Sequence, residues 1–169
     1  MLIPYSERHD AKTVEWLNSV ELRKTFGMTQ TVSLESHRAW IAAAGNVIIW
    51  AISASAAGHC GNVLLHCNGR HHSAYFQIYL GNTQARGKGI GRTALHLVLG
   101  HAFGPLRLHR VWLHTLPGNT AAERLYRSAG FVEEGKERDA LFRDGGYHSQ
   151  HRWSLLVGEW RPGSDEGGL

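Results

Sequence analysis

The sequence has only two cysteines in 169 residues, and it has no long apolar run. Two cysteines cannot form the disulfide framework of a small secreted domain, and Cys60 and Cys67 lack the spacing of a Cys-x-x-Cys site. No stretch reaches the ~20 apolar residues of a membrane-spanning helix. Residues 4–9 are polar and lack the charged-then-apolar order of a signal peptide. These absences predict a cytoplasmic protein with reduced thiols and no membrane partner.

The charged and metal-binding residues are not clustered either. The twelve histidines are dispersed, and no spacing resembles a closed zinc site, so no metal is expected. A net charge of +4 could serve nucleic-acid binding, but the basic residues are scattered along the chain. They concentrate only over residues 86–92 and 124–127, which suits one polyphosphate ligand better than a duplex. No specific nucleic-acid partner is therefore expected.

The size of the chain indicates one domain. With 169 residues, 43% of them hydrophobic, the chain can bury a substantial core but has little room for a second one. No repeat or internal linker is present. We expect a single domain over residues 1–160 and a flexible C-terminal tail over residues 161–169, which is polar and rich in glycine.

A glycine-rich turn joins a strand-like segment, residues 74–80, to a helical pattern that runs over residues 92–103. Because glycines occupy positions 87, 89 and 91, consecutive backbone N–H groups can approach an anion closely. The helix N-terminus adds about half a positive charge there. The segment therefore predicts a phosphate cradle. Its candidate binding residues are Arg86, Gly87, Lys88, Gly89, Ile90, Gly91 and Arg92.

Spacing excludes two common phosphate motifs. The mononucleotide P-loop fails because Gly81 and the pair at 87–88 enclose one residue too many, and no Ser or Thr follows. Residues 89–94 fit the dinucleotide pattern G-x-G-x-x-A, but that motif needs an acidic residue about 20 positions further on. Between residue 94 and Glu123 the sequence has no Asp or Glu. A dinucleotide-binding fold is therefore disfavoured.

The third motif, Arg86-x-x-Gly89-x-Gly91, resembles the acyl-CoA pyrophosphate loop of the GNAT superfamily of N-acetyltransferases. The resemblance covers nearly the whole chain and is weakest at the N-terminus. It implies that acetyl-CoA is the co-substrate and that the acceptor is a small-molecule amine. The elements that match the family order are the strand before the loop, the strand at 110–116, Asn119, Tyr126 and the pair Gly130-Phe131.

Together, the patterns and the resemblance predict an α/β (α+β) fold. We expect a mixed, mostly antiparallel central sheet of about six to seven strands with helices on both faces. A helical crossover should make strand 110–116 parallel to strand 73–80, and the resemblance implies that this parallel pair splays apart. The other expected strands are 47–53, 61–67, 132–141 and 148–157, and the other helices are 10–18, 20–25, 33–44 and 120–129.

Three details of these elements are also predicted. The helix that begins after Ser33 should bury Leu34, Ile41 and either Ala39 or Trp40. Residues 120–123 fit a capping box at the start of a helix. Asp144-Gly145 is typical of a hairpin turn.

The resemblance assigns roles around the splayed strands. Backbone groups near Ile78, Tyr79 and Leu80 would hold the pantetheine arm, and Asn119 would contact the cofactor. Arg127 is a further cofactor-binding candidate because it belongs to the second local group of basic residues. Tyr126 would donate a proton to the departing thiolate. Periodicity alone favours a core aromatic at position 126, whereas the motif position favours the acid.

The sequence does not determine which residue is the general base. In the family pattern Tyr75 takes the place where many relatives carry a glutamate. His66 and His114 have a suitable intrinsic pKa, Glu35 and Glu133 are further candidates, and a water chain could replace a base.

The acceptor is the least determined feature. Residues 130–148 resemble the Rim-type ribosomal-protein and spermidine acetyltransferases, whereas residues 16–18 with Phe26, His37 and Ile41 resemble acetyltransferases of nucleotide-linked amino sugars. We expect an amino-sugar nucleotide, with a protein N-terminal α-amine or a polyamine as alternatives. A CoA-binding regulatory module without turnover is the non-enzymatic alternative. Exposed strand edges allow a homodimer. The candidate substrate residues are Phe26, His66 and Tyr147.

Overall fold

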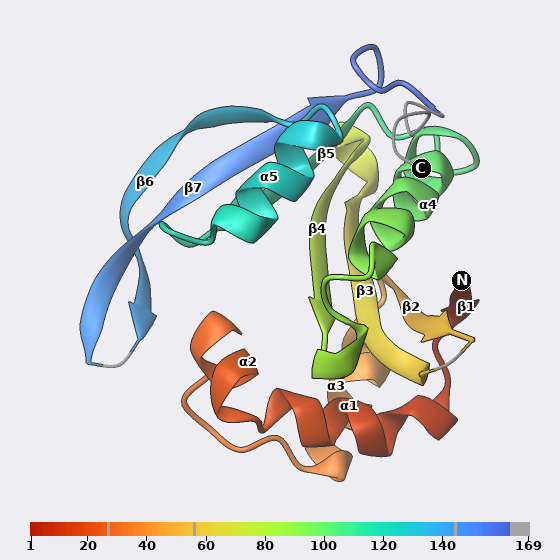
Figure 1. Cartoon of the computed structure of the whole chain (residues 1–169), viewed down its shortest axis with the longest axis vertical. Helices are drawn as coiled ribbons and strands as arrows, with labels where there is room; N and C mark the ends of the chain where they lie inside the picture. The colour runs from red at the N-terminus through yellow and green to blue at the C-terminus, as the bar shows by residue number, and fades with distance from the viewer. Residues whose placement is uncertain (27, 56, 144, 163–169) are drawn as a thin grey trace.

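The computed structural model of the protein describes residues 1–26, 28–55, 57–143 and 145–162. In these ranges seven strands form one sheet in the order β1-β2-β3-β4-β5-β7-β6 (Figure 1). The strands are β1 (Leu2–Pro4), β2 (Val47–Ala54), β3 (Gly58–Asn68), β4 (Ser73–Leu80), β5 (Arg110–Thr115), β6 (Val132–Arg143) and β7 (Gly146–Leu156). The helices are α1 (Asp10–Leu17), α2 (Val20–Phe26), α3 (Leu34–Ala43), α4 (Ile90–Phe103) and α5 (Thr120–Ser128).

The predicted fold class is confirmed. Every neighbouring pair of strands is antiparallel except β4 and β5, which the α4 crossover makes parallel. The sequence did not predict β1, because three residues are too few to show an alternating pattern. The turn residue Asp144 and residues 163–169 of the expected tail lie outside the described residues.

Side-chain alternation gives the sheet two buried faces. Phe76 of β4 joins the main core together with Leu95 and Leu99 of α4, while Tyr79 of the same strand points to the other face and packs with Trp16 of α1. Burial of each such leucine contributes roughly 1.5–3 kcal/mol. Helices α1 and α2 lie across one end of the sheet, at the bottom of Figure 1. β4 therefore separates a face covered by α4 from a face covered by the N-terminal helices.

The predicted burial of α3 is wrong. Leu34 is 42% exposed and Trp40 is 43% exposed, whereas His37 is only 6% exposed. The inner position belongs to His37 because its ring bonds with Tyr5, and a polar contact of this kind does not appear in an apolar pattern. The predicted cap is confirmed, since Ser33 Oγ accepts a hydrogen bond of 3.0 Å from Ser36 N.

The start of α5 also differs from the prediction. Asn119, not Thr120, is the N-cap, and its Oδ1 accepts from Ala122 N at 3.3 Å. Both side chains suit a helix start, and the turn after Gly118, where φ is +84°, places Asn119 in the capping position. The predicted glycine at the helix end is confirmed, since Gly130 has a φ of +92°.

None of the helices in the described ranges combines the length and the apolar character needed to cross a membrane. Strands β1 and β6 form the two edges of the sheet. Association through such an edge stays a prediction.

Candidate active site

The parallel strands β4 and β5 separate soon after they pair. Their ladder joins Ser73, Ala74 and Tyr75 to Arg110, Val111 and Trp112 and then ends, although β4 continues to Leu80 and β5 to Thr115. From Phe76 onward, the edge of β4 that faces β5 has no strand partner in the described chain. The predicted splay is therefore present, and it leaves room for an extended ligand that adds to β4 as a strand would.

A cavity of about 270 Å³ occupies this gap. Helix α5 closes one side of it through Tyr126 and Leu125, and Phe26 of α2 reaches it from the other face of the sheet. Backbone and side chains of both splayed strands form the walls. The lining residues used below are Phe26, Tyr75, Gln77, Ile78, His114, Asn119, Tyr126 and Gln150.

The glycine loop at the end of β4 is open to a ligand. Gly87 has a φ of +71° and Gly89 a φ of +75°, and a Cβ added at either would meet no atom within 4 Å. The backbone N–H groups of residues 87–91 donate to no acceptor among the described residues, whereas Thr93 N donates to Gly89 O at 3.0 Å as α4 begins. A row of free donors at a helix N-terminus fits a diphosphate.

Two of the predicted cationic partners are engaged in contacts within the protein. The Arg86 guanidinium donates to Leu80 O at 2.7 Å and pairs with Glu21, so it ties the end of β4 to α2. Arg127 pairs with Glu133 at 2.8 Å and stacks over the Trp153 ring. Lys88 is exposed beside the loop. A diphosphate at this loop would therefore meet mainly backbone donors, and a cofactor contact by the loop or by these three side chains stays a prediction.

Tyr126 lies in the gap as the motif predicts. Its side chain is 6% exposed, and its ring contacts Phe76 and Phe131. Burial raises the pKa of its phenol, and the neighbouring Tyr75 raises it further. Among the described residues, none forms a hydrogen bond with the Tyr126 hydroxyl, which leaves it available to a group in the cavity.

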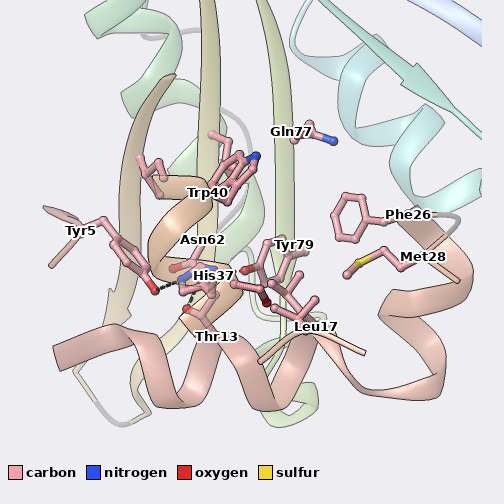
Figure 2. Close-up of a pocket in the computed structure, with 14 residues that line it drawn as sticks. Tyr5, Thr13, Leu17, Phe26, Met28, His37, Trp40, Asn62, Gln77 and Tyr79 are labelled. Atoms are coloured by element: carbon pink, nitrogen blue, oxygen red, sulfur yellow. Dashed lines mark hydrogen bonds between the residues drawn. The ribbon is translucent and has the colours of Figure 1, made fainter. Parts of the chain in front are cut away.

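A second cavity, of about 330 Å³, lies on the opposite face of β4, where side chains of α1 and α3 meet those of the sheet (Figure 2). The aromatic rings of Tyr5, Phe26, Trp40 and Tyr79 contribute much of its lining. Among the described residues, no Lys, Arg, Asp or Glu lines it. Phe26 and Gln77 line both this cavity and the gap, so the two cavities meet at these side chains. The sequence did not predict this cavity, because its walls come from segments that are distant in the chain.

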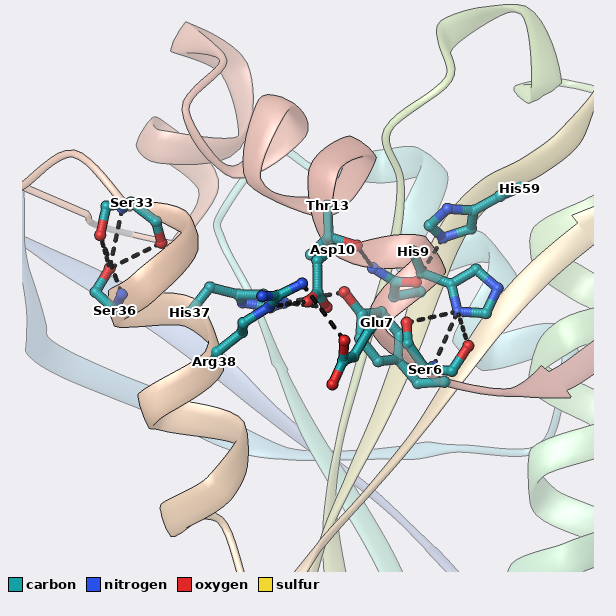
Figure 3. Close-up of polar contacts among 12 residues, drawn as sticks. Ser6, Glu7, His9, Asp10, Thr13, Ser33, Ser36, His37, Arg38 and His59 are labelled. Carbon is teal, nitrogen blue, oxygen red and sulfur yellow. Dashed lines mark hydrogen bonds and ion pairs between the residues drawn. The ribbon is translucent and has the colours of Figure 1, made fainter.

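Buried polar groups support the wall of this second cavity (Figure 3). Tyr5 and His37 share a hydrogen bond of 2.9 Å, and Asp10 lies 3.6 Å from the same His37 nitrogen. Arg38 donates to Asp10 at 2.8 Å. Burial raises the pKa of Tyr5 and lowers the pKa of His37, so both groups are held in their neutral forms. The cavity therefore carries no fixed charge of its own.

Three other candidates occupy different places. The His66 ring bonds with Gln77 Oε1 at 2.9 Å but lines neither cavity. Tyr147 is 70% exposed and packs on Phe142. His114 lines the gap and lies 3.0 Å from Glu137. In the described part of the chain, no group of three or more His, Cys, Asp or Glu residues could hold a metal ion.

The splayed strands and the backbone cradle define a protein that can hold an acyl-CoA thioester in extended form. A family model described as an acetyltransferase (GNAT) domain matches residues 1–132. The chain therefore belongs to the GNAT acetyltransferase family. The predicted family is thus confirmed, and acetyl-CoA, the predicted co-substrate, is the one that this family uses.

Several relatives carry the names of N-acetyltransferases. The spermidine N(1)-acetyltransferase of Vibrio cholerae is 36% identical over 97 residues, 57% of this chain and 56% of the relative. A Bacillus subtilis protein named "Putative ribosomal N-acetyltransferase YdaF" is 39% identical over 74 residues, 44% of this chain and 40% of the relative. The matches thus span about half the length of these curated relatives.

A solved structure shares the fold. The spermidine N-acetyltransferase of Vibrio cholerae, crystallised in complex with CoA and spermine, superposes with a TM-score of 0.87 at 24% identity. The superposition covers 94% of this chain and 96% of that one. At this identity the likeness establishes the fold alone.

Proposed function

We propose that the protein is an acetyl-CoA-dependent N-acetyltransferase whose acceptor is a primary amine of a polyamine. The observation that carries the proposal is the splayed β4–β5 gap, which ends at free backbone donors over residues 87–91. When bound, acetyl-CoA supplies the acetyl group as a thioester that the amine attacks with release of the thiol. The chain's own residues bind this group, exclude water and move protons.

Each part of the gap has a distinct role in this proposal. The amides of residues 87–91 hold the diphosphate, and the unpaired edge of β4 from Phe76 to Leu80 holds the pantetheine arm. Tyr126 keeps its proton because burial raises its pKa, so its phenol can pass that proton to the leaving sulfur. The amine loses one proton before it attacks and a second one as the amide forms. This second proton returns to the Tyr126 oxygen and restores the phenol.

The second cavity supports a polyamine over the expected amino-sugar nucleotide. A nucleotide diphosphate would need cationic side chains or further free amides, and none of the described lining residues is Lys or Arg. Aromatic rings attract ammonium groups, and Leu17 and Leu64 can pack against methylenes. The named spermidine acetyltransferases among the relatives favour the same acceptor.

A thiol-release assay with acetyl-CoA tests the proposal. Spermidine, an amino-sugar nucleotide and a peptide with a free N-terminus are compared under the same conditions, with acceptor-free reactions as the blank. We expect the highest kcat/KM with spermidine. A higher value with either other acceptor would refute the polyamine but retain the transferase. If CoA raises the Tm and no amine releases thiol, the protein is a binding module instead.

A further inference from the structure

An acetyltransferase must remove a proton from its acceptor before attack. A polyamine nitrogen has a pKa near that of lysine, about 10.4, so it arrives as an ammonium at neutral pH. The proton needs an acceptor on the face of β4 from which the amine arrives, opposite to Tyr126. Which residue takes this proton is inferred from the structure, and the inference rests on the proposed function.

Cavity lining reduces the choice to two histidines. Among the described residues that line either cavity, the titratable ones are four tyrosines and the histidines at 37 and 114. The pKa of each tyrosine is raised by burial, so none of them is a base at neutral pH. His37 is bonded to Tyr5 at the α1–α3 end of the second cavity and does not line the gap. His114 lines the gap itself.

Strand alternation places His114 on the correct face. Tyr75 pairs with Trp112 in the β4–β5 ladder, so His114, two residues further along β5, shares the face of Tyr75 and Gln77. Its ring lies 5.6 Å from that of Tyr75. Tyr126 belongs to α5 and packs on Phe76, which points to the opposite face. Acid and base would therefore flank a thioester held between the two strands.

A carboxylate orients the imidazole. His114 Nε2 lies 3.0 Å from Glu137 Oε2, an ion-pair approach rather than an aligned hydrogen bond, and this buried nitrogen has no other partner among the described residues. Glu137 is itself held by Gln150 at 2.7 Å and by Arg152 at 2.6 Å. A carboxylate beside Nε2 favours the tautomer with its proton there. No described residue forms a hydrogen bond with Nδ1, which keeps a free lone pair.

We propose that His114 is the general base and that Glu137 positions it. The ammonium N–H bond breaks, its electron pair stays on nitrogen, and the proton binds His114 Nδ1. Glu137 stabilises the resulting imidazolium, which returns the proton to water after the product leaves. The charged groups around the ring are Glu137 on β6 and Arg152 on β7, and Tyr75 faces it from β4.

The electrostatics agree with this role. Burial lowers the pKa of His114, Glu137 opposes that shift, and Arg152 adds to it. The ring is therefore neutral near pH 7 and ready to accept a proton. Hydrogen bonding to Gln150 lowers the pKa of Glu137, so the positioning carboxylate stays ionised.

The first test is the pH dependence of kcat/KM for His114→Gln with spermidine. Wild type should lose activity as the pH falls and His114 gains a proton. We expect the variant to lose about 100-fold in kcat/KM near pH 7 and to lack the plateau that wild type reaches once His114 is neutral. Its rate should instead keep rising with pH towards the amine pKa of about 10.4, as free amine becomes abundant. An unchanged rate with an unchanged acidic limb would overturn the proposal.

His151→Gln is a matched control, because His151 also faces a glutamate, Glu133, but lines neither cavity. It should keep the wild-type limb. Glu137→Gln removes the carboxylate that raises the pKa of His114, so the limb should move to lower pH with a smaller loss of rate. This shift decides the matter if His114→Gln does not fold, and an unmoved limb contradicts the proposal. Absence of wild-type turnover with every amine would instead refute the proposed function.

Discussion

Asn62 lies at the centre of a buried hydrogen-bond network on β3. Its Nδ2 donates to Thr13 Oγ1 at 2.8 Å and to Tyr79 Oη at 2.7 Å, and its Oδ1 accepts from His59 at 2.8 Å. Asn62 is only 1% exposed, so water cannot replace it there. Asn62→Ala would therefore leave the three partners without these hydrogen bonds. We expect a loss of about 2–4 kcal/mol in the free energy of unfolding, measured by urea denaturation.

Asn46→Ala is the matched control. Asn46 is exposed, and its amide donates to Cys67 O at 3.2 Å, where water can replace it. We expect a loss of no more than about 1 kcal/mol. Equal losses for the two variants would mean that the network beneath the second cavity contributes little to stability.

Removal of one oxygen atom tests the predicted acid. Tyr126→Phe keeps the ring that packs on Phe76 and Phe131 but removes the phenol that would protonate the leaving sulfur. We expect kcat to fall by about 100-fold or more, since general acids contribute on that order. The affinity for acetyl-CoA, measured by calorimetry, should stay close to that of wild type. An unchanged kcat would leave Tyr126 as a core aromatic only.

Adding one methyl group to the loop between β4 and α4 tests whether this loop binds acetyl-CoA. Gly89→Ala places a Cβ in the open cradle at a φ of +75°, where an L residue is strained. We expect a loss of about 1 kcal/mol in stability, as for a strained left-handed residue, and a fall of about tenfold or more in acetyl-CoA affinity.

Gly58→Ala separates these two effects. Gly58 is the first residue of β3 and pairs with Ala54 of β2. Its φ is +59°, and a Cβ there would also meet nothing within 4 Å. The variant should lose similar stability while its calorimetric affinity for acetyl-CoA stays unchanged. If both variants weaken binding equally, the cradle is not the diphosphate site.

Elements that are decided locally were predicted well from the sequence. The β4–loop–α4 unit follows from strand alternation, three glycines and helical periodicity, all within one stretch of the chain. Elements that are decided by distant contacts were not. The burial of His37 depends on Tyr5, 32 residues away, and β1 exists because three residues pair with β2. The cap at Asn119 rather than Thr120 depends on the backbone path after Gly118.

The same distinction applies to the site. The loop over residues 86–92 and Tyr126 could be singled out from the sequence because local motifs mark them, and their roles stay predictions. The second cavity was missed because α1, α3, β3 and β4 assemble it only in the folded chain. Of the predicted substrate residues, Phe26 reaches both cavities, whereas His66 and Tyr147 reach neither.

The sheet as a whole separates the two halves of the proposed reaction. The α4–α5 face brings Tyr126 to the gap, and the other face brings the second cavity to the same gap. Phe26 and Gln77 are the side chains at which these two spaces meet. In the proposed reaction, the thioester in the gap and the amine in the second cavity therefore meet at that junction.

The titratable groups of the whole molecule predict a loss of stability in acid. Burial lowers the pKa values of His9, His37 and His59 below the unfolded value of 6.5. As the pH falls below about 6.5, the unfolded chain binds protons that the folded chain does not, so stability must fall. Hydrogen bonding to Arg110 lowers the pKa of Glu134 to about 2. Its contribution is present above the unfolded value of 4.5 and is lost as the pH falls towards 2.

Urea denaturation at several pH values measures this dependence. The midpoint should be lower at about pH 5.5 than at about pH 7.5, and lower again below about pH 4.5, where Glu134 begins to lose its advantage. Between about pH 7.5 and 8.5 the buried histidines are neutral in both states, so the midpoint should hold steady and serves as the internal control. His59→Gln should flatten the first decrease, because it removes one of the groups that only the unfolded chain protonates. A midpoint that is equal at pH 5.5 and 7.5 would show that these histidines take up protons without unfolding, and that their burial is not maintained in solution.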